Sequence, residues 1–121
     1  MFELKVTDSF AAAHNLRGYE GECENLHGHN YTVEVVIAAK TLNKLGVVVD
    51  FKLIKKELNE VISLFDHSYL NNQPPFIQKN ATAENIAREI YNKLKGKFKP
   101  ARVTRVTVYE SEKASASYIG R

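Results

Sequence analysis

Apolar and polar residues alternate along two segments in the first third of the chain, residues 2–14 and 27–39. Alternation with a period of two is typical of a β-strand that buries one face. In the second segment Tyr31 and Val33 share one parity, and polar side chains occupy the other. The intervening residues 15–25 are polar and contain two glycines, which indicates a loop. We therefore expect two long strands that pair antiparallel.

The middle of the chain has the apolar spacing of amphipathic helices. Asp50 can cap a helix over residues 51–65, whose apolar stripe comprises Leu53, Ile54, Leu58, Val61, Ile62 and Phe65. Thr82 is the expected N-cap of a second helix, which Gly96 and Pro100 bring to an end. The asparagines and prolines between the two helices indicate a loop.

Strand character returns near the end of the chain, in residues 102–109 and 114–119. A phase slip at Thr104-Arg105 indicates a β-bulge in the first of these strands. The order ββααββ predicts an α+β domain, with a four-stranded antiparallel sheet and both helices on one face. Because such a sheet has exposed edges, we also expect subunits to associate through them.

Length and composition restrict the class of protein. A chain of 121 residues, 44% apolar and 26% charged, fits one folded domain over residues 1–121. Its apolar stretches fall far short of the ~20 residues that cross a bilayer, so no membrane contact is expected. The net charge of +3 mildly favours an anionic ligand but is too small to indicate nucleic acid. The single cysteine excludes an intramolecular disulfide and, with no secretory signal visible, predicts a cytoplasmic protein.

Three histidines fall at matching strand ends. His27 and His29 project from one face of a strand about 6.6 Å apart, close enough for both rings to reach one ion. His14 ends the neighbouring strand and can supply a third nitrogen. A chance His-X-His pair is the alternative for His27 and His29 alone. The three together favour zinc with one open coordination position, the pattern of a catalytic site.

Cys23 lies four residues before His27 in a polar segment. A lone cysteine is more often a buried structural thiol. A nearby dication would instead favour its thiolate, the form that acts as a general base. Glu22 and Glu24 would oppose this effect, and either of them could be the base in place of the cysteine; otherwise both belong to a solvated loop.

Further polar residues stand at the ends of predicted elements. Asp66 and His67 follow the first helix, and taken alone they fit an ordinary helix end and a surface imidazole. As a pair, a carboxylate could orient a histidine for proton transfer. Glu110 ends a strand; such a carboxylate usually faces solvent, but it can also bind an amidine-like ligand edge through two hydrogen bonds.

Several of these motifs occur together and in order: Ala-Ala-His14, Cys23-X3-His-Gly-His29, Val48-Val-Asp-Phe51, Asp66-His67, Ala81-Thr-Ala-Glu-Asn85 and Val108-Tyr-Glu110. The set closely resembles the 6-pyruvoyl-tetrahydropterin synthase family over nearly the whole chain. The three-residue gap after Cys23 resembles the 6-carboxy-tetrahydropterin synthase branch, which belongs to queuosine biosynthesis.

The resemblance implies a T-fold (tunnelling fold) whose subunits form a homohexamer of two trimers, with the sites between subunits. It implies a zinc ion on His14, His27 and His29. It makes Cys23 the proton acceptor and makes the Asp66 and His67 pair a proton relay. It also implies that Glu110 anchors the pterin, with Thr82 and Ala83 lining that pocket.

The implied reaction is that of a lyase acting on a pterin triphosphate. It converts 7,8-dihydroneopterin triphosphate to 6-carboxy-5,6,7,8-tetrahydropterin, acetaldehyde and triphosphate. The nearest alternatives are a 6-pyruvoyl-tetrahydropterin synthase and a dihydroneopterin aldolase-like activity on the same scaffold, the latter because some relatives use a glutamate near the cysteine as the base. An alternative of another class is a zinc- or pterin-binding protein without turnover.

Overall fold

Two long strands form the centre of the fold in the computed structural model, which describes residues 1–18 and 25–120. Strand β1 covers Phe2–His14 and strand β2 covers His27–Ala39. They pair antiparallel along their whole length, from Phe2 opposite Ala39 to His14 opposite His27. The predicted pair of strands is thus confirmed, with one histidine directly across from another.

The two C-terminal strands continue the sheet. Strand β4 (Arg102–Ser111) pairs antiparallel with β2, and β5 (Ala114–Ile119) pairs antiparallel with β4. The register between β2 and β4 shifts so that Thr104 has no partner residue on β2. Its hydroxyl donates a 3.3 Å hydrogen bond to the carbonyl oxygen of Val36 instead. The bulge indicated by the phase slip is confirmed.

A fifth strand was not predicted. Strand β3 comprises only Ser68–Tyr69 and pairs parallel with β1, opposite Ala12 and Ala13. The sheet is therefore five-stranded and mixed, in the order β3-β1-β2-β4-β5, rather than four-stranded and antiparallel. Two residues are too few to show an alternating pattern, so this strand leaves no periodic signal in the sequence.

The two helices begin where their caps were expected. Helix α1 (Phe51–Ile62) follows Asp50, whose carboxylate accepts from the Lys52 N–H, and α2 (Ala83–Leu94) follows the N-cap Thr82. Helix α1 ends three residues before the predicted end at residue 65. Phe65 is nevertheless only 1% exposed, because the turn after the helix folds it back into the core. Its apolar character reflects burial rather than helix.

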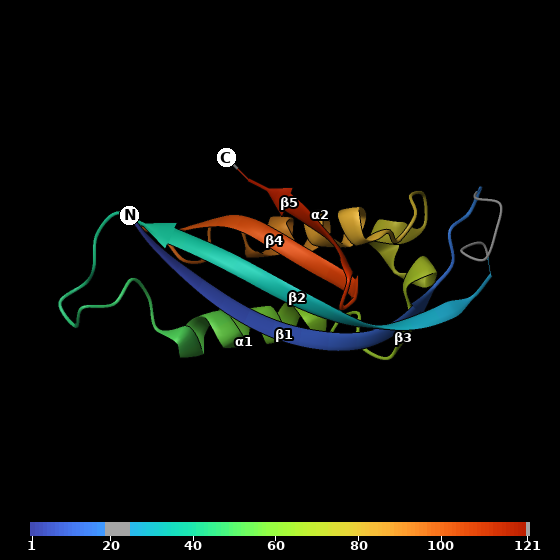
Figure 1. The fold of residues 1–121 in the computed structure, drawn as a ribbon, viewed down its shortest axis with the longest axis horizontal. Helices are drawn as coiled ribbons and strands as arrows, with labels where there is room; N and C mark the ends of the chain where they lie inside the picture. The colour runs from blue at the N-terminus through green and yellow to red at the C-terminus, as the bar shows by residue number, and fades with distance from the viewer. Residues whose placement is uncertain (19–24, 121) are drawn as a thin grey trace.

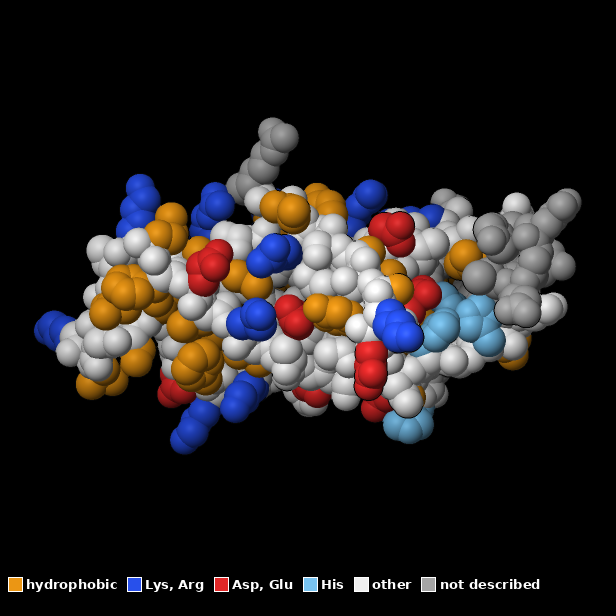
Figure 2. All heavy atoms as spheres, viewed as in Figure 1, with side chains coloured by type: hydrophobic (Ala, Val, Ile, Leu, Met, Phe, Trp, Pro, Cys, Tyr) orange, Lys and Arg blue, Asp and Glu red, His pale blue; other side chains and the backbone are white. Residues whose placement is uncertain are grey.

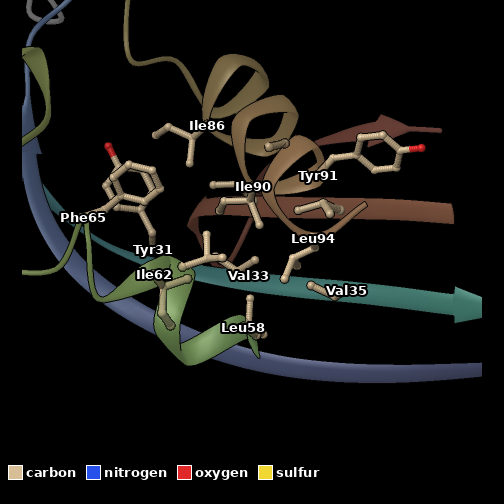
Figure 3. Close-up of a cluster of buried hydrophobic side chains, with 14 of the residues drawn as sticks. Tyr31, Val33, Val35, Leu58, Ile62, Phe65, Ile86, Ile90, Tyr91 and Leu94 are labelled. Atoms are coloured by element: carbon tan, nitrogen blue, oxygen red, sulfur yellow. The ribbon is translucent and has the colours of Figure 1, made fainter. Parts of the chain in front are cut away.

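Two short 3-10 helices, η2 (Leu70–Asn72) and η3 (Pro74–Phe76), connect β3 to α2. Helices α1 and α2 lie together behind the sheet in Figure 1, and the histidine-bearing ends of β1 and β2 reach the end of the molecule opposite the N-terminus. The core fills the space between helices and sheet (Figure 3); its largest side chains include Tyr31, Phe65, Phe76, Ile37, Leu58 and Ile90. Among the described residues, no helix is long and apolar enough to cross a membrane.

Candidate metal centre

Three imidazole rings converge at one end of the sheet. His14 and His27 are cross-strand partners, and His29 lies two residues further along β2 on the same face. The ring centroids are 4.6 Å apart for His14 and His27, 5.0 Å for His14 and His29, and 4.8 Å for His27 and His29. One ligand atom from each residue lies within 4.8 Å of the other two. Figure 2 shows histidine surface gathered at this end of the molecule.

Backbone carbonyl groups orient two of these rings. The Nδ1 of His14 donates to the carbonyl oxygen of Ala81 at 2.7 Å, and the Nδ1 of His27 donates to that of Asn25, also at 2.7 Å. A hydrogen bond at Nδ1 fixes the tautomer and leaves Nε2 as the ligand atom. The carbonyl groups thus aim both rings before any ion is bound.

The unpaired nitrogens fit a metal ion. Within residues 1–18 and 25–120, the buried Nε2 atoms of His14 and His29 have no hydrogen-bond partner. Burial lowers the pKa of His14, with smaller opposing effects from the Ala81 hydrogen bond and the charge of Glu110. The neutral ring that results offers the lone pair a metal needs. A set of three imidazoles suits zinc and several other divalent ions.

The Asp66 and His67 pair lies beside this cluster and is anchored to β1. The Oδ1 of Asp66 accepts a 2.9 Å hydrogen bond from the N–H of Ala11 and lies 3.0 Å from the Nδ1 of His67. The backbone N–H of His67 donates back to the Ala11 carbonyl at 2.6 Å. The pKa of Asp66 lies below its ordinary value, chiefly because its carboxylate accepts the Ala11 N–H and also because His67 is close. Adjacency in the sequence did not establish a contact between the Asp66 and His67 side chains, and the structure shows that contact.

His67 turns its side chain outward into a shared pocket. Its φ of 55° is in the left-handed region, and its side chain is 82% exposed. A pocket of about 480 Å³ is lined by His67, His29 and Gly28, among others. With Nδ1 held by Asp66, the Nε2 of His67 is the nitrogen free to exchange a proton with a molecule in that pocket.

Glu110 lies on the other side of His29. It shares a pocket of about 670 Å³ with His29 and a smaller one of about 180 Å³ with Ala83. Thr82 caps α2 by accepting from the N–H of Asn85 at 3.1 Å, so its hydroxyl still has a hydrogen to donate. The structure thus brings Glu110 near Ala83 and near the histidines, with His29 between the Glu110 and His67 pockets.

Cys23, Glu22 and Glu24 lie outside the described residues, so the choice of base among them stays a prediction from the sequence.

Comparisons with known proteins agree with this arrangement. The profile of the 6-pyruvoyl tetrahydropterin synthase family matches residues 3–121. The chain belongs to that family. Membership makes it an enzyme and confirms the resemblance that the motifs carry.

Relatives of known name include 6-carboxy-5,6,7,8-tetrahydropterin synthases from bacteria. The one from Synechocystis is 35% identical over 115 residues, which cover 91% of this chain and 87% of the relative. The one from Rickettsia bellii is 34% identical over 122 residues, with 84% and 88% coverage. These family members carry the narrower name that the spacing after Cys23 favours.

Solved structures of the family share the fold. The 6-pyruvoyl tetrahydropterin synthase of Caenorhabditis elegans has a TM-score of 0.87 and 30% identity, covering 99% of this chain and 96% of that one. A Plasmodium vivax 6-pyruvoyltetrahydropterin synthase, in which a catalytic glutamate is replaced by cysteine, has a TM-score of 0.78 and 25% identity, with 97% and 96% coverage. The expected T-fold is confirmed by these neighbours.

The sequence did not single out two features of this family member's site. The Ala81 carbonyl that orients His14 belongs to a segment 67 residues away, and no local pattern indicates it. Tyr31 also lies against the site, with ring centroids 5.8 Å from His14 and 5.4 Å from His29. The sequence signal that could have indicated Tyr31 is its position two residues after His29, which puts it on the same face of β2 as both histidines.

Proposed function

We propose that this chain is a zinc-dependent 6-carboxy-5,6,7,8-tetrahydropterin synthase. The reaction takes 7,8-dihydroneopterin triphosphate and water to 6-carboxy-5,6,7,8-tetrahydropterin, acetaldehyde and triphosphate. The observation that carries the proposal is the convergence of three imidazoles, one of which, His29, lines a pocket together with His67. The names of the curated relatives support the choice of product.

In this proposal His14, His27 and His29 hold the zinc ion. Bound there, zinc supplies Lewis-acid polarisation of the substrate's side-chain oxygens, which acidifies the adjacent C–H bonds. The Ala81 and Asn25 carbonyls keep two of the rings in their binding orientation.

Proton transfer is assigned to Cys23 and to the Asp66 and His67 pair. Cys23 is the proposed acceptor of the proton from the substrate side chain. His67 is the proposed donor to the pterin, through Nε2, while Asp66 fixes the ring and stabilises its charged form. Glu110 is the proposed anchor of the amino-pyrimidine edge through two hydrogen bonds. Ala83 lines a pocket with Glu110, and Thr82 precedes Ala83 in the chain as a further proposed part of the pterin site.

We further propose a homohexamer of two trimers as the working assembly. Strands β3 and β5 are the two edges of the sheet, and an edge strand offers unpaired backbone groups to a second chain. The exposure of His67 and the half-exposure of Glu110 fit sites that a neighbouring subunit completes.

A second candidate is the pyruvoyl-forming synthase, which the likeness to the C. elegans protein favours. The two products separate the candidates. Zinc-loaded protein is incubated with 7,8-dihydroneopterin triphosphate, and the products are identified by mass spectrometry. We expect acetaldehyde and the 6-carboxy pterin in equal amounts. A 6-pyruvoyl product without acetaldehyde would replace our choice with the second candidate.

A further inference from the structure

Tyr31 lies in the wall of the histidine site, although none of the proposed roles uses it. It follows His29 by two residues and therefore shares the face of β2 that carries both His27 and His29. Its side chain is completely buried, at 0% exposure. The His14 and His29 rings meet its ring edge-on, with interplanar angles of 86° and 68°.

Packing fixes the orientation of the Tyr31 ring. It stacks on Phe10 at a centroid distance of 4.9 Å and an interplanar angle of 16°, and Phe10 in turn contacts Phe65 at 6.0 Å. In Figure 3 the hydroxyl oxygen of Tyr31 stands at one end of the core cluster, on the side away from Val35 and Leu94. A ring held this way delivers its hydroxyl to one place, with little conformational entropy left to lose when a ligand binds.

The Tyr31 hydroxyl has no hydrogen-bond partner in the described part of the chain. Within residues 1–18 and 25–120, only two other buried side-chain polar atoms lack one, the Nε2 atoms of His14 and His29. All three atoms belong to rings in mutual contact. Because unpaired buried polar groups cost stability and are rare, three in one place indicate one binding site rather than three separate defects.

A packing role does not account for the hydroxyl. Phenylalanine has the same ring and would stack on Phe10 without burying an oxygen. A tyrosine hydroxyl, whose ordinary pKa is about 10, is neutral near pH 7 and can donate a hydrogen bond. In this site the Tyr31 hydroxyl can therefore donate a hydrogen bond to an acceptor oxygen of a bound ligand.

We propose that the Tyr31 hydroxyl donates a hydrogen bond to a side-chain oxygen of the pterin bound at His14, His27 and His29. The proposal rests on the proposed function and adds a catalytic residue to it. The pterin's side-chain hydroxyl oxygens gain negative charge as the adjacent carbon is deprotonated. A pre-oriented neutral donor stabilises that charge without having to reorganise.

The test compares Tyr31→Phe with Tyr91→Phe. Tyr91 is a matched control because it is also a buried tyrosine of the core, but its hydroxyl stands at the opposite end of the cluster in Figure 3. We expect Tyr31→Phe to lower kcat about 10²-fold, as the loss of one such donor does elsewhere, while KM changes little. Tyr91→Phe should keep the wild-type kcat.

Two readouts do not depend on turnover. Zinc affinity, titrated with the metal alone, should be the same in Tyr31→Phe and wild type. The affinity for neopterin, an oxidised pterin with the same side-chain hydroxyls, should fall in Tyr31→Phe and stay unchanged in Tyr91→Phe. Without metal or pterin, Tyr31→Phe should unfold at the wild-type temperature or above it, because it no longer buries an unpaired oxygen.

Three results would overturn the proposal. The first is wild-type kcat and neopterin affinity in Tyr31→Phe. The second is a loss of zinc affinity, which would assign the hydroxyl to the metal site. The third is a lower unfolding temperature in the ligand-free variant, which would mean the hydroxyl is already paired. If the wild-type enzyme formed another product, the proposed function would be contradicted. The neopterin affinities of Tyr31→Phe and Tyr91→Phe would still decide the role of Tyr31.

Discussion

At the scale of single residues, the four histidines divide into two groups that different experiments can separate. His14, His27 and His29 present nitrogens to one another, whereas His67 presents Nδ1 to Asp66 and lies 82% exposed. Nδ1 is paired in His14, His27 and His67 alike, so the two chemistries differ in what surrounds the free Nε2: other imidazoles in the first group, an open pocket at His67.

We predict that His27→Ala loses most of its zinc, since two imidazoles are too few to hold the ion firmly. His67→Ala is the matched control and should keep stoichiometric zinc while its turnover falls about 10²–10⁴-fold. Metal content measured by atomic emission and activity on the same samples check both expectations. Full zinc occupancy in His27→Ala would contradict the ligand assignment.

For Cys23 we predict that replacement by alanine keeps zinc and lowers turnover about 10²-fold or more, because no thiolate remains to take the proton. Parallel assays of Glu22→Gln and Glu24→Gln test the alternative bases. If either glutamine variant lost activity while Cys23→Ala kept it, the glutamate would be the base.

Asp66 gives a prediction for pH. Its pKa is lowered in the folded protein, mainly by the Ala11 N–H, so its stabilising effect is complete above the ordinary pKa of an aspartate. This stabilising effect is lost as the pH falls from the ordinary pKa of an aspartate through the lowered pKa of Asp66 in the folded protein. Asp66→Asn should therefore be less stable than wild type at pH 7, and the difference should narrow only in that acidic window. Thermal unfolding across pH checks this; a constant difference at every pH would contradict it.

At the scale of elements, hydrogen bonds from side chains to backbone tie the segment after β1 to the 3-10 helix η2. The buried side chain of Asn71 accepts from the N–H of Asn15 at 3.1 Å and donates to its carbonyl at 2.9 Å. The hydroxyl of Tyr69 donates to the Asn15 side chain at 2.5 Å. This pairing joins the residue after His14 to the segment that follows His67.

We predict that Asn71→Ala destabilises the protein by about 1–3 kcal/mol, because it leaves two part-buried backbone groups of Asn15 unpaired. Asn72→Ala, at the exposed neighbouring position, should change stability by no more than about 0.5 kcal/mol. Urea denaturation measures both. Equal losses in the free energy of unfolding for the two variants would contradict the stabilising role of the Asn71 hydrogen bonds to Asn15.

At the scale of the whole molecule, both helices cover one face of the sheet and leave the other free of helices (Figure 1). That free face carries polar contacts, among them a Lys5–Glu34 ion pair at 3.8 Å and a 2.6 Å hydrogen bond between Thr107 and Ser117. A polar face and two open edges suit a sheet that continues into neighbouring subunits and encloses water.

We predict that the protein sediments as a particle six times the mass of one chain, because pairing through β3 and β5 satisfies the backbone groups of both edges. Analytical ultracentrifugation at micromolar concentration tests this. A monomer under these conditions would contradict both the edge pairing and the shared sites.

The sequence by itself determined the long elements and the histidine cluster. Hydrophobic periodicity and helix caps are local signals, so β1, β2, the bulge at Thr104 and the starts of both helices followed from them. The cluster followed as well, since strand parity and an antiparallel pair bring His14 beside His27. Only the tertiary structure decided the two-residue β3, the early end of α1 and the partners of Ala11, Ala81 and Asn71. These depend on contacts between residues far apart in the chain, and such contacts leave no periodic trace.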